Sequence, residues 1–212
     1  MLFRCAIHTV GSDSWRVAKV PCTNVKNGRP PISTDDAGTV HWMTGCNTKK
    51  MPKSNECLKC HILSMEVSNE EFRITRDPPD SRIDDDNNSL VELGGSLSLL
   101  HYVSRREIDV WVLEDYYGET WQKKYCINIS GSRFKCLPWD AHAFAASLEK
   151  GEVLIFVGDY NLRRLFSYDP KQQKLIEVKA HLKHIWSWAQ LLKFPCTHVE
   201  SLVTLKSIHA KL

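Results

Sequence analysis

Short apolar segments alternate with polar turns along most of the chain. One arrangement occurs four times, at residues 5–20, 61–75, 108–127 and 165–178. It consists of an apolar segment, a polar turn and a second segment that begins with a large apolar residue. The leading residues of the second segments are Trp15, Phe72, Trp121 and Leu175. They are 57, 49 and 54 residues apart, and this spacing indicates a repeated unit built from antiparallel strands.

A second kind of strand pair lies between these hairpins and has glycine at its bend. The bends fall at residues 36–38, 94–95 and 150–151. Glycine adopts the positive φ angles that tight hairpin turns require. Equivalent positions after the bends, Val40, Leu97 and Val153, are 57 and 56 residues apart. The two kinds of hairpin together predict a unit of four antiparallel strands.

This repeat predicts an all-β fold, a partial kelch-like β-propeller of repeated four-stranded antiparallel blades. Each twisted sheet of such a fold buries its faces against neighbouring sheets. We expect one domain over residues 1–212, with two strands of one blade, three whole blades, a closing strand at 201–205 and at most one short helix, at 181–193. A mixed α/β sandwich is the alternative. Four tryptophans are expected to pack between blades: Trp15, Trp42, Trp111 and Trp121.

The composition fits a folded domain and argues against two kinds of partner. The 212 residues are 42% hydrophobic and 25% charged, with a net charge of +3, which gives no reason to expect nucleic acid binding. The longest runs without a charged residue, 37–48 and 93–104, are shorter than the roughly 20 apolar residues of a membrane-spanning helix. No secretory signal is recognised. We therefore expect no membrane association, a cytoplasmic or nuclear location, and eight cysteines that remain thiols.

Several short segments, taken in order, carry more information than any one of them. They are Gly11-Ser-Asp-Ser-Trp-Arg16, Gly38-Thr-Val-His-Trp42, Val91-Glu-Leu-Gly-Gly-Ser-Leu97, Asp109-Val-Trp-Val-Leu-Glu-Asp-Tyr116, Trp121-Gln-Lys-Lys-Tyr125 and Tyr168-Asp-Pro170. This series resembles the F-box-associated interaction domain of plant F-box proteins. The resemblance implies a kelch-like propeller that captures a protein destined for ubiquitination, while a separate F-box docks the Skp adaptor of a cullin–RING ligase.

No segment ahead of this domain resembles an F-box. The resemblance therefore implies the C-terminal part of a longer protein, or a paralogue or gene model that has lost its front half. Without the F-box, binding to the Skp adaptor is not expected. The implied partner is a protein substrate whose identity depends on loop side chains that follow no sequence code.

One spacing suggests a metal site, Cys57-Leu-Lys-Cys60-His61, which matches half of many zinc sites and the haem-attachment signature. A second C-x-x-C pair is lacking, and although Cys46 could complete a ligand set, loop thiols are the favoured interpretation. No nucleophile pattern or phosphate-binding loop is found. We therefore predict no cofactor, no metal and no enzymatic activity. The open alternatives are a metal- or small-ligand-dependent enzyme on a propeller scaffold and a non-functional truncated paralogue.

The partner surface is expected on the face that carries the long connections between strands. In an up-and-down blade these connections lie opposite the short turns, and loops on a rigid scaffold often bind partners. Arg, Trp and Tyr supply many of the residues that dominate binding energies. The predicted partner-binding residues are Arg82, Arg105, Arg106, Trp139, Tyr160 and Arg163.

Overall fold

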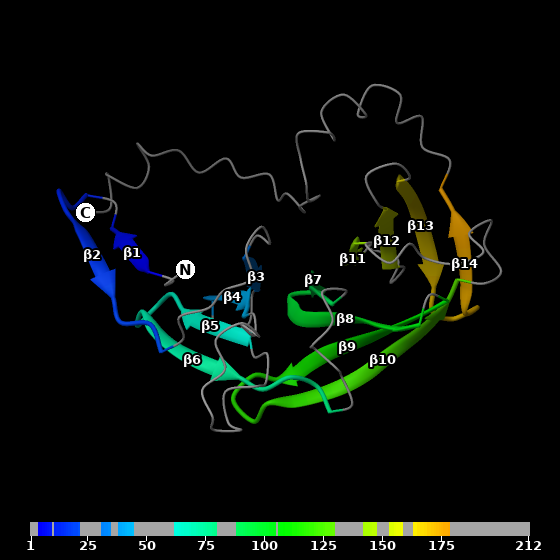
Figure 1. Cartoon of the computed structure of the whole chain (residues 1–212), viewed down its shortest axis with the longest axis horizontal. Coiled ribbons are helices and arrows are strands. Elements are labelled where there is room, and N and C mark those ends of the chain that lie inside the picture. The colour runs from blue at the N-terminus through cyan, green and yellow to red at the C-terminus, as the bar shows by residue number, and fades with distance from the viewer. Residues whose placement is uncertain are drawn as a thin grey trace, which may run out of the picture.

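The structure, a computed structural model, describes residues 4–9, 11–21, 31–34, 38–44, 62–79, 88–104, 106–129, 142–147, 153–158 and 163–178. In these stretches all of the regular elements are β-strands (Figure 1). The strands form one two-stranded sheet and three four-stranded sheets. The predicted all-β fold of repeated four-stranded units is therefore confirmed.

Each sheet is an antiparallel meander in which every strand pairs with its neighbours in the sequence. The two-stranded sheet contains β1 (Cys5–His8) and β2 (Trp15–Ala18). Sheet 1 contains β3 (Ile32–Thr34), β4 (Thr39–Met43), β5 (Ile62–Glu66) and β6 (Glu71–Thr75). Sheet 2 contains β7 (Ser89–Leu93), β8 (Ser96–Ser104), β9 (Glu107–Asp115) and β10 (Thr120–Asn128). Sheet 3 contains β11 (His142–Ser147), β12 (Val153–Gly158), β13 (Arg163–Asp169) and β14 (Lys174–Glu177).

The turns between the third and fourth strands of the sheets are built alike. Asp115 Oδ1 accepts hydrogen bonds from the backbone N–H groups of Tyr117 (3.0 Å) and Gly118 (2.9 Å) in the β9–β10 turn. Asp169 accepts the equivalent bonds in the β13–β14 turn. The last turn residue has a positive φ angle at Glu70 (60°), Glu119 (53°) and Gln173 (50°). The aspartate hydrogen bonds help to hold a turn that includes this unfavourable conformation.

Of the three predicted glycine bends, the one at 94–95 is described in full, Gly38 is described at the one at 36–38, and the one at 150–151 lies outside the described residues. Gly94 and Gly95 connect β7 to β8 with φ angles of 63° and 87°, the combination found in a two-residue type I′ hairpin turn. In sheet 1 the bend residue Gly38 accepts a backbone hydrogen bond from Val67 at 3.1 Å. The two short turns of this sheet therefore lie together at one end of its strands.

Sheet 2 is packed on both faces. Its β9 strand is buried continuously from Ile108 to Leu113, and alternate residues point to opposite faces. One face packs on Met43 and Ile62 of sheet 1 through Leu90, Leu97, Leu99, Trp111, Leu113, Tyr116 and Trp121. The other packs on Val153, Ile155, Phe166 and Tyr168 of sheet 3 through Val91, Leu93, Leu100, Ile108, Val110, Ile127 and Ile129. Sheet 2 is thus the centre of the described core.

The sheets follow one another along an arc, with their first strands on the inner side (Figure 1). Strands β3 and β11 both contact β7 there. The fourth strands, β6, β10 and β14, lie on the outer side (Figure 1). Sequential sheets with first strands inside and last strands outside are the arrangement of propeller blades.

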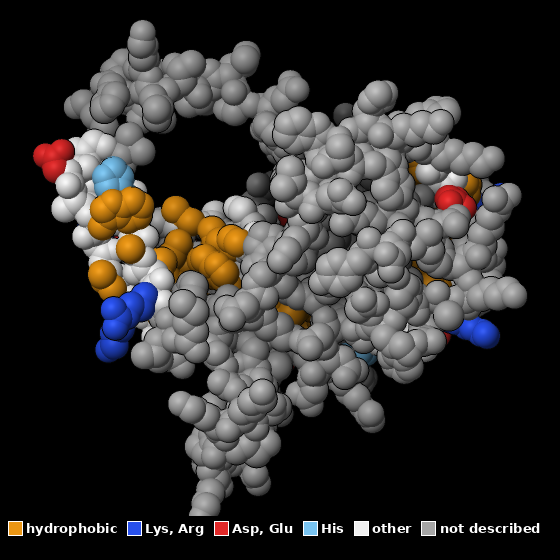
Figure 2. Space-filling view, turned by 45° about the horizontal axis from the view of Figure 1, so that its top comes forward, with side chains coloured by type: hydrophobic (Ala, Val, Ile, Leu, Met, Phe, Trp, Pro, Cys, Tyr) orange, Lys and Arg blue, Asp and Glu red, His pale blue; other side chains and the backbone are white. Residues whose placement is uncertain are grey.

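The tryptophan prediction is confirmed for Trp111 and Trp121, which are 7% and 9% exposed, while Trp42 is half-buried beside Phe72. It is wrong for Trp15, which is 68% exposed. Trp121 and Leu175, at equivalent positions, pack toward the preceding sheet. The two-stranded sheet has no preceding sheet among the described strands, and Figure 2 shows hydrophobic side chains uncovered at this end.

Two sequence predictions fall outside the described residues. These are the short helix at 181–193 and the closing strand at 201–205. Among the described residues, no helix has the length and apolar character needed to cross a bilayer.

A matched pair of substitutions tests this packing. Trp121→Ala should lower the free energy of unfolding by about 3–5 kcal/mol, since it removes a buried indole between sheets 1 and 2 and its 2.8 Å hydrogen bond to the Arg76 carbonyl. Trp15→Ala, at the equivalent repeat position, should cost less than ~0.5 kcal/mol because that side chain is exposed. Urea denaturation measures both, and equal losses would contradict the assignment of neighbouring sheets.

Candidate functional site

The long connections leave the sheets at the end opposite the short turns. Segments 44–61, 76–88 and 129–141 join strands at this end, as the up-and-down order requires. Four predicted partner-binding residues lie in connections outside the described residues: Arg82, Arg105, Trp139 and Tyr160. Arg163 begins β13 opposite Gly158, but its side chain is not among those described. The role of these five therefore stays a prediction.

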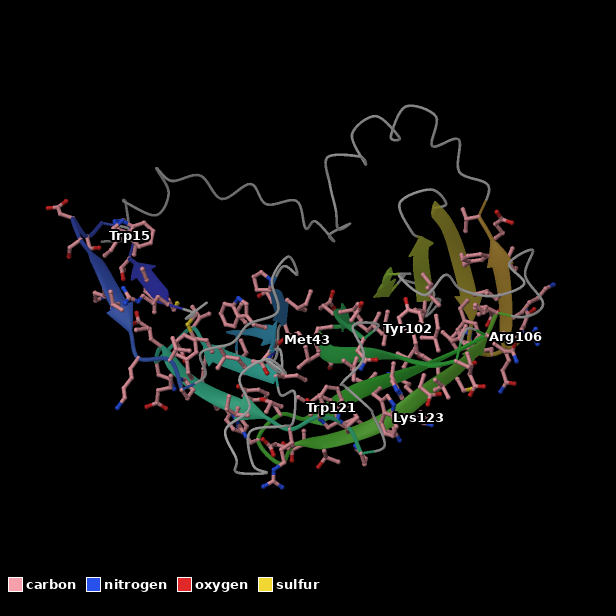
Figure 3. All side chains as sticks on the ribbon, in the orientation of Figure 1. Trp15, Met43, Tyr102, Arg106, Trp121 and Lys123 are labelled. Carbon is pink, nitrogen blue, oxygen red and sulfur yellow. The ribbon has the colours of Figure 1, made fainter. Side chains whose placement is uncertain are left out.

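Arg106 is the member of the predicted set whose side chain is described. It is exposed in the β8–β9 connection, at the far end of sheet 2 from Trp121 (Figure 3). Its backbone N–H donates to Ser104 Oγ at 3.1 Å, and its carbonyl accepts from the N–H of Ile129 at 2.9 Å. A fixed backbone with an exposed guanidinium suits a binding residue, because the backbone at this position need not be ordered on binding.

A buried chain of polar side chains crosses sheet 1. Thr34 Oγ1 lies 3.1 Å from His41 Nε2, His41 Nδ1 lies 2.8 Å from Ser64 Oγ, and Ser64 Oγ lies 2.9 Å from Thr75 Oγ1. All four residues are less than 5% exposed. The distance between Ser64 and His41 would suit a nucleophile and its base, but neither side chain is accessible to a substrate. The hydrogen bonds among these four residues instead satisfy polar groups inside the core.

Burial lowers the pKa of His41 to about 4. The imidazole lies against the Tyr116 ring of sheet 2, with 5.8 Å between centroids. Both ring nitrogens already have hydroxyl partners in the neutral form. Burial therefore favours the neutral imidazole in the folded protein. Sequence reasoning missed it, because it depends on the register of β4 against β5.

Ion pairs join the last strand of one sheet to the last residue of the turn between the third and fourth strands of the next sheet. Arg16 of β2 binds Glu70 with two hydrogen bonds, one of 2.7 Å from Nη1 to Oε2. At the next junction, Arg73 of β6 lies 3.4 Å from Glu119, and its guanidinium lies 4.8 Å from the centre of the Tyr116 ring. The equivalent positions of sheets 2 and 3 hold Gln122 and Gln173. Charged residues thus occur together at two junctions, and neutral residues at the third.

Glu107, Asp109 and Cys126 form a further polar cluster on sheet 2. One possible ligand atom from each lies within 4.8 Å of the others. The Cys126 thiol donates to Glu107 Oε1 at 3.2 Å, and this bond, with burial and the nearby carboxylates, raises its pKa to about 11. Lys123 Nζ lies 2.7 Å from Asp109 Oδ2 and 5.2 Å from the centre of the Trp111 ring.

Comparison with known proteins agrees with the architecture. A family model described as an F-box associated beta propeller domain matches residues 2–200. The chain belongs to this family. The resemblance seen in the sequence is thereby confirmed, and this family accounts for the repeated four-stranded sheets.

Two curated relatives from Arabidopsis thaliana are similar over part of their length. The F-box protein At3g07870 is 26% identical over 193 residues, covering 79% of this chain and 41% of the relative. The F-box/kelch-repeat protein At3g04660 is 24% identical over 148 residues, covering 66% of this chain and 34% of the relative. The chain therefore spans less than half the length of these relatives.

The buried histidine predicts a pH dependence of stability. An imidazole in the unfolded chain has a pKa near 6.5, whereas that of folded His41 is about 4. Between these values the unfolded chain binds more protons, so the free energy of unfolding should fall as the pH is lowered from about 6.5 to 4. His41 should contribute about 3 kcal/mol to this fall.

Urea denaturation of His41→Gln and wild-type protein at several pH values measures the difference. The variant should lose this part of the pH dependence, whereas His8→Gln, at an exposed position, should keep it. A wild-type slope in His41→Gln would show that His41 is not a buried neutral group.

The Arg73–Glu119 pair predicts a non-additive effect. Arg73→Gln and Glu119→Gln should each destabilise the protein, because each removes one charge of a half-buried pair. Glu119 keeps Arg76 as a second partner in Arg73→Gln, so this variant should be the milder of the two. The double variant, which carries the pair of residues found at the next junction, should be more stable than additivity predicts by about 0.5–1 kcal/mol. A double-mutant cycle by urea denaturation measures this coupling energy. A value of zero would show that the ion pair does not stabilise the contact between sheets 1 and 2.

Proposed function

We propose that this chain is a protein-interaction module that recognises a substrate for an SCF-type ubiquitin ligase. The observation that carries the proposal is the family match over residues 2–200. The two relatives described above are F-box proteins. The architecture adds support, since it is a rigid scaffold with long connections at one end of its sheets.

The chain is proposed to act by binding rather than by catalysis. Of the described residues, Ser64 and His41 come closest to a catalytic pair, and both are buried. Its role would be to hold a protein partner, inside the cell in the cytoplasm or nucleus. The whole of residues 1–212 is proposed to form this one domain.

The proposed contact surface includes Arg106 and the connections that carry Arg82, Arg105, Trp139, Tyr160 and Arg163. Arg106 is exposed on a fixed backbone. A guanidinium forms paired hydrogen bonds with carboxylates, which favours an acidic or carboxylate-rich patch on the partner. Adaptor docking is assigned to an F-box, and the 212 residues contain no segment that resembles one.

Binding by Arg106 can be tested once a partner has been identified by affinity purification and mass spectrometry. Arg106→Ala should weaken binding of the purified partner about tenfold, on the order of the effect of losing one hot-spot side chain, without changing the melting temperature. The control is Lys171→Ala in the exposed β13–β14 turn, which lies at the end of sheet 3 opposite the long connections. Titration calorimetry measures the affinity of both variants for the partner. A loss of affinity in Lys171→Ala alone would show that the partner binds at the end with the short turns.

The ligase part of the proposal is tested separately. The purified chain should not bind the Skp adaptor, and it should slow the ubiquitination of the same partner by an intact F-box relative. Direct binding of the adaptor to the 212-residue chain, or no effect on that reaction, would contradict this role.

A further inference from the structure

The cluster of Glu107, Asp109 and Cys126 lies on one face of sheet 2. Glu107 and Asp109 are two residues apart on β9 and so point to the same side. Cys126 lies directly opposite Asp109 on β10 because the strand register shifts between Lys123 and Tyr125. Without that shift, Cys126 would pair with Ile108 and point to the other face. A local bulge therefore creates the cluster.

A second observation distinguishes this cluster from a group of surface acids. Asp109 is only 4% exposed. Its Oδ2 is held by Lys123, but its buried Oδ1 has no hydrogen-bond partner among the described residues. A buried carboxylate oxygen without a donor is unfavourable. A bound cation would satisfy this atom.

We propose that Glu107, Asp109 and Cys126 bind a zinc-like divalent metal ion. Two carboxylate oxygens and one sulfur suit Zn²⁺, which accepts both ligand types, whereas Mg²⁺ and Ca²⁺ select oxygen. The ligand atoms are within 4.8 Å of one another, so small side-chain movements would bring them to zinc distances of roughly 2.0–2.3 Å. Water takes the fourth position of the tetrahedron.

The surroundings agree with this assignment. Cys126 is exposed, so an ion can enter from solvent. As the zinc–sulfur bond forms, the thiol loses its proton to water. The formal charges of two carboxylates, one thiolate, the Lys123 ammonium and Zn²⁺ then cancel. Lys123 holds one oxygen of the Asp109 carboxylate, Oδ2, at 2.7 Å, as neighbours of metal ligands often do.

Cobalt binding tests the site, because a Co²⁺–thiolate bond gives a charge-transfer absorption that oxygen ligands do not. The Cys57→Ser/Cys60→Ser variant of the full chain serves as the background, since it removes the C-x-x-C thiols. Titration with CoCl₂ should produce the band at one equivalent, and ZnCl₂ should abolish it. Adding Cys126→Ser should remove the band, whereas adding Cys5→Ser, the other described free thiol, should leave it.

Equilibrium dialysis with Zn²⁺ adds a measurement on the carboxylates. Glu107→Gln should weaken zinc binding at least tenfold in the same background, and its melting temperature without metal shows whether it is folded. No band in the background protein, or a band that survives Cys126→Ser, would overturn the proposal. Unchanged zinc affinity in folded Glu107→Gln would do the same.

Discussion

Packing of sheet against sheet is the constraint on which the rest of the structure depends. A meander of four strands leaves two faces to be covered, and a twisted sheet of short strands covers them only with other sheets. Sheet 2 shows the requirement met on both sides: its face toward sheet 1 carries Trp111 and Leu113, and its face toward sheet 3 carries Ile108 and Val110. The two-stranded sheet shows it unmet, since Trp15 remains exposed.

The same constraint explains where polar groups are tolerated. The chain of Thr34, His41, Ser64 and Thr75 lies in the region that faces sheet 2, where every member has a hydrogen-bond partner. The ion pair of Arg16 links β2 to the β5–β6 turn, and that of Arg73 links β6 to the β9–β10 turn. Apolar contacts thus supply the burial, while these polar contacts favour one relative placement of neighbouring sheets.

The strands and turns could be predicted from the sequence because their signals are local. The glycines at 94 and 95 and the alternation of apolar residues are signals within a few residues. The recurrence of the Trp121 position at intervals of 57, 49 and 54 residues then shows that these local patterns repeat. Contacts that depend on register were not predictable in this way. His41 meets Ser64 across the connection 44–61, and Cys126 meets Asp109 through a bulge. Of the proposed partner surface, the sequence supplied Arg106 as a candidate but not the hydrogen bonds that fix its backbone.

Hydrogen exchange followed by mass spectrometry tests whether each sheet is held in place by its neighbours. Protection reflects the free energy of the opening that exposes each amide. Strands β8 and β9 should exchange slowest. Sheets 1 and 3 should be less protected because, among the described sheets, sheet 2 is the one with a buried apolar cluster on both faces, and β1 and β2 should exchange fastest. Protection of β1 and β2 equal to that of β8 and β9 would contradict this dependence on neighbouring sheets.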